Sequence, residues 1–506
     1  MNLKEYLSHD ATGLASLIKA GDITSKELVE LAIKIIDLQN PVVNAVVQDY
    51  REQAFEQVNN VRPLEGPFQG VPILIKDMLN LEGTIAAYGS RLLKLNSGHN
   101  THEVLKRLFS GGFINLGRTN MSEMGFTPTT EPELYGSCNN PWNLEHSPGG
   151  SSGGSGAAVA AGMVPLAYAS DGGGSIRIPA AACGLFGLKP SRGRNPMDME
   201  DHTEGILVHH VVSRSVRDSA AVLDLTQGSR AGDRWVLPRP KQSYVEMIQR
   251  KPGKLRIAVS RTDFSGRLAD DDNQKAIDHT INLLKECGHE VFEVSPDIDP
   301  DSFQEAFKRI WAISAGYVLR LVQKHFNRMD NLPSFVKDAL KNRGFFQFML
   351  NLKNPFTGAQ LMEKMTLKLA AMEQNYSASE HWMQMDILQE AHYTFGEFLE
   401  KYDVFLCPVL GSAPWRTGHI DFNWDPDTIQ EQLYRYAGFT PLGNSSGFPA
   451  MSVPLYINSE NLPIGMQFYS GLGKDGLLLQ LAAQLEDLDP WFDKLPEKTM
   501  QLTSIL

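Results

Sequence analysis

The chain has 506 residues, of which 42% are hydrophobic and 21% are charged, a composition typical of a globular protein with a large core. Its 47 Lys and Arg residues are outnumbered by 59 Asp and Glu residues, which gives a formal net charge of −12. A chain with this acidic excess and no basic block is not expected to bind nucleic-acid phosphates or a membrane surface. The sequence contains no uninterrupted apolar run of about 18 residues, so no membrane-spanning segment is expected.

The N-terminal residues 1–38 predict two amphipathic helices and contain no apolar signal core, so we expect no targeting peptide. Thr24 and Glu27 stand at the spacing of a capping box before the second helix. Apolar residues then recur along one face of that helix, at Leu28, Ala32, Ile35 and Ile36. We expect these helices to pack on the outside of the fold as an N-terminal segment of residues 1–65.

A short apolar run at residues 71–75 ends in Lys76 and predicts a buried strand. A lysine at a strand end usually reaches solvent along its aliphatic stem. If the amine is buried instead, the loss of water disfavours the ammonium and lowers its pKa, which leaves a neutral amine able to accept a proton. The pattern by itself favours the first interpretation, and both stay open at this point.

Residues 147–192 contain two clusters of glycine and serine, at 149–156 and 172–175. Between them, small residues at 157–162 predict a helix and an apolar run at 163–169 predicts a buried strand. Each cluster therefore lies at the end of a regular element. Glycine there permits positive φ and a close approach of the backbone, and serine supplies a hydroxyl.

The first cluster also has the composition of a flexible Gly/Ser linker and the spacing of a nucleophile elbow. A linker does not usually lead directly into a helix and a strand, which disfavours the first of these interpretations. The elbow G-x-S-x-G of the α/β-hydrolases needs an apolar strand immediately before it. His146, Ser147 and Pro148 stand there instead, which disfavours the elbow.

Downstream, residues 255–260 and 290–295 predict two strands around a helix at 272–287, an alternation typical of a layered α/β sheet. Residues 301–400 predict mainly helices, rich in aromatic residues and Met. These residues include Phe303, Phe307, Trp311, Tyr317, Phe345, Phe346, Phe348 and Met349. Helix packing is the ordinary role of such residues, and a lid or substrate pocket is the alternative.

The last predicted strands follow at residues 404–410, 450–455 and 464–470. We therefore expect a core of residues 66–300 that carries the functional residues and is completed by residues 401–506. Residues 301–400 form the variable helical part between them.

The four cysteines are not spaced like a disulfide framework, since none stands at C-x-x-C spacing. They are Cys138, Cys183, Cys287 and Cys407. Free thiols in apolar surroundings favour a cytoplasmic location. The 13 histidines include one adjacent pair, His209 and His210, and no H-E-x-x-H motif. We therefore expect no metal site and no cofactor.

The glycine–serine segment resembles that of the amidase signature family, amide hydrolases with a Ser–Ser–Lys triad. The matching stretches are GVPxxxKD at 70–77, GGSSGGS at 149–155, GGSIRxPAA at 173–181, CGxxGxKP at 183–190 and LPIGxQ at 462–467. They are specific and spread over most of the chain. Within that family, TTEPE at 129–133 and NPWN at 140–143 resemble the 6-aminohexanoate cyclic-dimer hydrolases.

The resemblance implies an α/β amidase signature fold, in which a large mixed β-sheet is covered by helices on both faces and carries a variable, mainly helical insertion. It implies Ser175 as the nucleophile, Ser151 on a cis peptide as the proton relay, and a neutral Lys76 as the base. The candidate oxyanion donors are the backbone N–H groups of Gly172, Gly173, Gly174 and Ser175. One departure from the family pattern is Gly172, where many members have Thr or Ile.

These features predict an amidase that hydrolyses linear or cyclic amide C–N bonds through an acyl-enzyme on Ser175. Aromatic residues before the turn at 441–447 favour an uncharged aliphatic or aromatic amide over glutamine. They are Trp415, Tyr434, Tyr436 and Phe439. Cyclic or linear 6-aminohexanoate oligomers are specific candidates.

Three alternatives remain: the amidase subunit of a glutamine-dependent tRNA amidotransferase, a non-catalytic binding protein on the amidase fold, and an esterase of the α/β-hydrolase type. We expect a cytoplasmic enzyme that acts on a small-molecule amide, with no nucleic-acid or membrane partner. A homodimer is left open.

Overall fold

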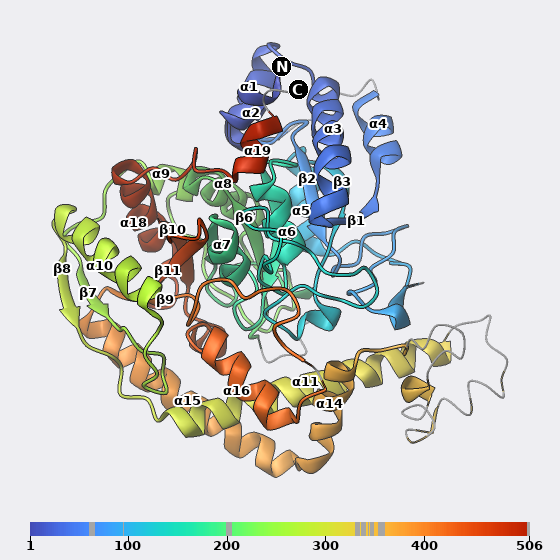
Figure 1. The fold of residues 1–506 in the computed structure, drawn as a ribbon, viewed down its shortest axis with the longest axis vertical. Helices are drawn as coiled ribbons and strands as arrows, with labels where there is room; N and C mark the ends of the chain where they lie inside the picture. The colour runs from blue at the N-terminus through green and yellow to red at the C-terminus, as the bar shows by residue number, and fades with distance from the viewer. Residues whose placement is uncertain are drawn as a thin grey trace.

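In this computed structural model, the described residues are 1–59, 66–94, 96–198, 205–328, 334, 338, 341–342, 344, 349–352, 360–421 and 423–502. Phe345, Phe346 and Phe348 of the predicted aromatic region lie outside them. Among the described residues, eleven strands form one mixed sheet, which runs through the molecule between layers of helices (Figure 1).

The sheet joins two parts of the chain, residues 46–213 with strands β1–β6 and residues 256–469 with strands β7–β11. In spatial order they are β1 (Val46–Asp49), β3 (Ile114–Thr119), β2 (Pro72–Lys76), β4 (Leu166–Asp171), β6 (Val208–Ser213), β5 (Phe186–Lys189), β10 (Ala450–Ile457), β11 (Pro463–Tyr469), β9 (Val404–Pro408), β7 (Arg256–Val259) and β8 (Glu290–Glu293). β3, β2 and β4 are parallel, as are β9, β7 and β8, and the strands between these groups are antiparallel. The seam is the antiparallel pair β5–β10, in which Lys189 lies opposite Ala450.

Side chains alternate along the strands, so both faces of the sheet are buried. In β9, Val404 and Leu406 belong to a core cluster with α10 (Asp271–Glu286) and α18 (Asp475–Leu488). Phe405 belongs to a second cluster on the opposite face, with α15 (Ala378–Lys401). Helices therefore cover this part of the sheet on both sides.

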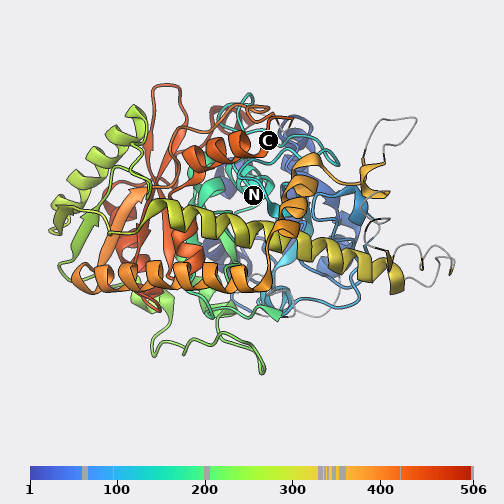
Figure 2. The same cartoon turned by 90° about the horizontal axis from the view of Figure 1, so that it is seen from below.

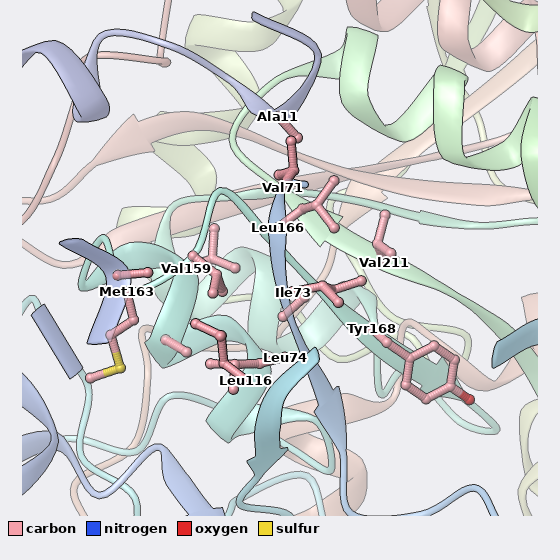
Figure 3. Packing of buried hydrophobic residues seen from close by; sticks show 14 of the residues in the cluster. Ala11, Val71, Ile73, Leu74, Leu116, Val159, Met163, Leu166, Tyr168 and Val211 are labelled. Carbon is pink, nitrogen blue, oxygen red and sulfur yellow. The ribbon is translucent and has the colours of Figure 1, made fainter. Parts of the chain in front are cut away.

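The core around β2 and β4 holds the part of the sheet that matters for function. Ile73 and Leu74 of β2 pack with Leu166 of β4, Val211 of β6 and Val159 of α6 (Gly153–Ala160), as Figure 3 shows. None of these five side chains is more than marginally exposed. This packing fixes the two parallel strands whose carboxyl ends carry Lys76 and Asp171.

Two long helices, α11 (Pro300–Arg328) and α15, pack against each other and extend along one side of the molecule (Figures 1 and 2). α14 (Lys364–Met372) packs on α11. Further along the chain come α16 (Pro426–Ala437) and α17 (Pro441–Ser446). Further helices earlier in the chain are α4 (Arg51–Asn59), α5 (Glu103–Ser110), α7 (Arg177–Cys183), α8 (Val216–Thr226) and α9 (Tyr244–Met247).

The N-terminal residues form three helices rather than the two that were predicted: α1 (Leu3–Leu7), α2 (Ala11–Ala20) and α3 (Ser25–Val43). The predicted capping box of Thr24 and Glu27 is present at the start of α3. Near Gly162, the C-terminal helix α19 (Glu497–Gln501) comes close to α1, and both lie at one end of the molecule (Figure 1).

The predicted α/β class, with one large mixed sheet and helices on both faces, is confirmed. Seven strands predicted from apolar runs are present, although β4 ends at Asp171 rather than at residue 169. β1, β3, β5 and β6 were not predicted. The segment boundaries at residues 65, 300 and 400 stay predictions.

Candidate active site

Lys76 and two serines meet at the carboxyl ends of β2 and β4. These strands are parallel neighbours, with Ile75 opposite Tyr168, so their ends reach the same edge of the sheet. Lys76 Nζ lies 2.7 Å from Ser151 Oγ and 3.0 Å from Ser170 Oγ. The amine is thus held between a serine on a loop and a serine of β4.

Burial decides the chemistry of this lysine. Lys76 is 1% exposed, so the interpretation in which its amine reaches solvent is wrong. Burial lowers the pKa of Lys76 to about 7, and the nearby carboxylate of Asp171 partly opposes this change. Near neutral pH, a large fraction of the amine is therefore unprotonated and able to accept a proton.

The loop that carries Ser151 is tightly fixed and leads directly into α6. The Gly150–Ser151 peptide bond is cis. Thr130 pins the loop from both sides, because its hydroxyl donates to the carbonyl of Gly149 at 2.9 Å and accepts from the N–H of Gly153 at 3.1 Å. A methyl group on Gly150 would lie 2.6 Å from the carbonyl oxygen of Thr129, so the loop can approach its neighbour only as glycine.

This geometry overturns two of the alternatives for the first glycine–serine cluster. Residues 149–156 are buried and continue into α6, so they are not a flexible linker. The residues before Gly149 form a loop, so the strand that a nucleophile elbow requires is missing.

Ser175 lies at the end of the second glycine cluster, 8% exposed, just before α7. The carboxylate of Asp171 organises this loop: it accepts from the N–H of Gly174 at 2.7 Å and from the N–H of Ile176 at 3.1 Å. The N–H of Gly174 is therefore engaged, which argues against the prediction that it is an oxyanion donor. No described residue accepts a hydrogen bond from the N–H of Gly172, Gly173 or Ser175.

Arg177 ties this loop to the second half of the chain. Its guanidinium pairs with Asp171, at 3.0 Å from Nε to Oδ2. Burial alone would raise the pKa of Asp171, but the charge of Arg177 holds that pKa well below its usual range. Arg177 also donates to Gln467 at 2.7 Å and to Asn444 at 2.5 Å. Its partners are protein groups, in keeping with the structural role that we expect for it.

Two cavities meet at Ser175. The first, about 130 Å³, is lined mainly by apolar side chains of α7, α14 and α16, among them Ile178, Met365, Leu369 and Leu433. The second, about 270 Å³, is lined by the polar cluster and by apolar residues, among them Lys76, Ser151, Ser170, Leu207 and Val318. Gly125, Phe126, Ser175 and Trp311 line both cavities.

The predicted aromatic pocket is partly correct. Tyr434 lines the first cavity, whereas Trp415 and Tyr436 stack on each other with ring centroids 4.0 Å apart and line neither cavity. Phe439 lines neither cavity as well and belongs to the core. From the helical region, Phe307 and Trp311 do line a cavity, so the pocket alternative is correct for these two.

The two adjacent histidines are held by neighbouring hydroxyl groups. His209 bonds to the hydroxyl of Tyr168 at 2.6 Å and His210 to the hydroxyl of Ser219 at 2.8 Å. The four cysteines carry free thiols. Within the described part of the chain, no three His, Cys, Asp or Glu side chains group as metal ligands, and none of the helices is both long and apolar enough to cross a membrane.

Comparisons with known proteins bear on the fold and on the reaction. A family model described as Amidase matches residues 27–479. A 6-aminohexanoate-cyclic-dimer hydrolase of Paenarthrobacter ureafaciens is 33% identical over 98% of this chain and 97% of its own length. A putative amidase AmiC of Mycobacterium leprae is 32% identical over 95% of each chain. A solved structure of a 6-aminohexanoate cyclic dimer hydrolase has a TM-score of 0.87 and 31% identity, and the match covers 97% of this chain and 99% of that one.

The match spans nearly the whole of both chains and includes the segments around Lys76, Ser151 and Ser175. The predicted amidase signature fold and the predicted activity, hydrolysis of an amide C–N bond, are therefore confirmed. The chain belongs to the amidase family and is an amide-hydrolysing enzyme.

Proposed function

We propose that this amidase cleaves its substrate through an acyl-enzyme on Ser175, with Ser151 and Lys76 moving the protons. The observation that carries this proposal is the 2.7 Å contact between Ser151 Oγ and Lys76 Nζ, made by a lysine whose pKa burial lowers to about 7. A serine hydroxyl is a weak nucleophile and needs such a base.

In the first half of the reaction, Ser175 Oγ attacks the amide carbonyl while its proton passes through Ser151 to the neutral amine of Lys76. The N–H groups of Gly172, Gly173 and Ser175 stabilise the negative charge that develops on the carbonyl oxygen. The C–N bond then breaks as Ser151 delivers a proton to the leaving amine. In the second half, water attacks the acyl-enzyme, the same relay removes its proton, and the acid and Ser175 are released.

The apolar lining of the first cavity supports an uncharged acyl group as the substrate's body. Relatives named as 6-aminohexanoate-cyclic-dimer hydrolases make cyclic or linear 6-aminohexanoate oligomers specific candidates. Free thiols support a cytoplasmic location. A homodimer is compatible with this function and is not required by it.

The decisive experiment uses a fluorophosphonate probe together with hydrolysis of hexanamide by the purified chain alone. Ser175→Ala should lose both labelling and turnover, whereas Ser152→Ala, one residue from the relay serine, should keep labelling. Ser152 is a suitable control because its hydroxyl bonds to the carbonyl of Ser170 at 3.2 Å and not to Lys76. Labelling that survives in Ser175→Ala would refute the proposed nucleophile.

The same assay separates the alternatives. An amidotransferase subunit would need partner chains and would prefer glutamine, and a non-catalytic binding protein would not turn over any amide. Hydrolysis of hexanamide by the isolated chain, faster than hydrolysis of glutamine, supports the proposal against both.

A further inference from the structure

We propose that Trp311 divides the active site into two chambers, and that the natural substrates are secondary amides with an uncharged, apolar group on each side of the C–N bond. The first cavity, lined by Ile178, Met365 and Leu433, is the acyl chamber. The second, lined by Lys76 and Val318, is the amine chamber. This inference rests on the proposed roles of Ser175 and Ser151.

The assignment of the chambers follows from where the proton must go. The leaving amine takes its proton from Ser151, and Ser151 and Lys76 line the second cavity and not the first. The amine side of the substrate must therefore point into the second cavity. Because Ser175 lines both, the acyl group bonded to it is left to extend into the first.

Trp311 stands where the two cavities meet and is held there by three contacts. Its ring packs edge to face on Phe126, with centroids 5.8 Å apart, and stacks on Phe307 at 5.6 Å. Its Nε1–H donates to the carbonyl of Phe126 at 3.4 Å. These contacts favour one position of the ring, between the two cavities.

Gly172, where this chain departs from the family pattern, lies beside the ring of Trp311. A methyl group on Gly172 would lie 3.5 Å from the Trp311 ring, and one on Gly173 would lie 3.6 Å from it. A single methyl group would just fit, but the branched side chains of Thr or Ile would displace the indole. Gly172 therefore lets the ring lie directly against the loop that leads to Ser175.

The charges of the two chambers define which groups they accept. Among the described residues that line them, none is acidic. The acyl chamber has two cations, Lys308 and Lys368, which interact with Asp427 at 3.5 Å and with the carbonyl of Trp424 at 2.6 Å. A substrate ammonium in either chamber would lose its water and find no counter-charge. Linear 6-aminohexanoate oligomers, which carry a free ammonium, are therefore disfavoured, whereas cyclic ones carry no charge.

The first test is a substrate panel given to the purified wild-type chain: hexanamide, N-butylhexanamide and N-(4-aminobutyl)hexanamide. We expect kcat/KM for N-butylhexanamide to exceed the value for either of the others by about tenfold or more, since each apolar methylene that fits a pocket contributes to discrimination. Equal values for hexanamide and N-butylhexanamide, or for the charged and uncharged secondary amides, would overturn the proposal.

The second test fills one chamber at a time. Val318→Phe narrows the amine chamber and Leu433→Phe the acyl chamber, and the two positions are matched because both are half-buried members of one apolar cluster. We expect Val318→Phe to lower kcat/KM about tenfold for N-butylacetamide and little for hexanamide, and Leu433→Phe to do the reverse. The opposite pattern would refute the assignment of the chambers.

The third test concerns Trp311 itself. Trp311→Ala should reduce the preference for N-butylhexanamide over hexanamide by about tenfold, and Trp311→Phe should reduce it less. Trp382→Ala, at an indole that is 66% exposed on α15, is the control and should leave the ratio unchanged. If the probe labels Ser175 but Trp311→Ala keeps the wild-type ratio of kcat/KM for N-butylhexanamide to that for hexanamide, only this inference fails. If Ser175 is not labelled, the proposed function fails first.

Discussion

Lys76 is the side chain whose protonation should control the rate. If its neutral amine is the base, kcat/KM rises with pH as the ammonium loses its proton and levels off above the pKa of about 7. Lys76→Met should lower kcat by about 10²–10⁴-fold and abolish this rising limb. A pH–rate profile of both proteins between pH 5 and 9 measures this.

Lys189 provides a matched control for that experiment. Its amine is also fully buried, and burial likewise lowers its pKa to about 7, but Nζ donates to the carbonyl of Pro190 and not to a serine of the site. Lys189→Met should keep the rising limb in whatever activity remains. If the rising limb is lost in Lys189→Met and kept in Lys76→Met, the titrating group is Lys189 and not Lys76.

We expect Ser170 to position the amine of Lys76. Its hydroxyl lies 3.0 Å from Lys76 Nζ and donates to the thioether of Met78, which holds the amine toward Ser151. Ser170→Ala should lower kcat about three- to tenfold, the value of one hydrogen bond, with little change in KM. It should also shift the rising limb of the pH profile, which a loss of folding alone would not do. An unchanged limb would contradict this role.

The sequence could propose Lys76, Ser151 and Ser175 as candidates because they stand in long, specific motifs. Ser170 has no such signal, since a serine near a strand end is common and only the pairing of β2 with β4 brings it to the lysine. Trp311 was one of many aromatic residues in a helical region. Its contact with Gly172 joins positions far apart in the chain, so only the tertiary structure reveals it.

At the scale of elements, a carboxylate of α8 holds the first turn of α2. Asp218 accepts from the N–H of Ala11 at 2.7 Å and from the N–H of Thr12 at 2.9 Å, two donors that have no partner within the helix. Asp218→Ala leaves both donors without a partner, and that of Ala11 is buried, so we expect the free energy of unfolding to fall by about 1–3 kcal/mol.

Urea unfolding measures that change, and kcat at low temperature should stay near the wild-type value because α2 lies outside the active site. Asp278→Ala is the control, since this carboxylate is 62% exposed and pairs with Arg261 on the surface. Its effect should stay below about 1 kcal/mol. Equal losses in the two variants would contradict the role of Asp218 at the start of α2.

Strands were predictable where an apolar run stood alone, as at β2, β9 and β11. β5 is only four residues long and contains Gly187, and β6 contains His209 and His210, which break the apolar pattern. Both are buried in the sheet, where β6 pairs with β4 and β5, and β5 also pairs with β10. Their strand conformation is set by tertiary pairing rather than by local propensity.

For the whole molecule, Arg177 links the two parts of the chain at the active site. Arg177→Ala would leave the carboxylate of Asp171 buried without its partner, and removal of one member of such a pair costs about 3–5 kcal/mol. We expect a loss of unfolding free energy of this size in urea, together with a loss of turnover as the loop to Ser175 loosens.

Arg416→Ala is the matched control for that variant. Arg416 pairs with Glu145 at 2.5 Å, but both side chains are more than half exposed, so the change should stay below about 1 kcal/mol. If Arg177→Ala is as stable as Arg416→Ala, the network around Asp171 does not hold the two parts together.

The order of the strands could not be predicted from the sequence, because the seam between β5 and β10 pairs residues that are distant along the chain.

The contacts of Arg177 across the two parts of the chain also bear on the synthesis of the enzyme. Arg177 can form its hydrogen bonds to Asn444 and Gln467 only after these residues, 267 and 290 positions further along the chain, have been synthesised. At the usual pace of translation this is roughly 15 to 60 s. During that interval Lys76, Ser151 and Ser175 have all been synthesised, but the two residues that anchor the loop of Ser175 have not. We therefore expect the nascent chain to lack amidase activity until Gln467 has been synthesised.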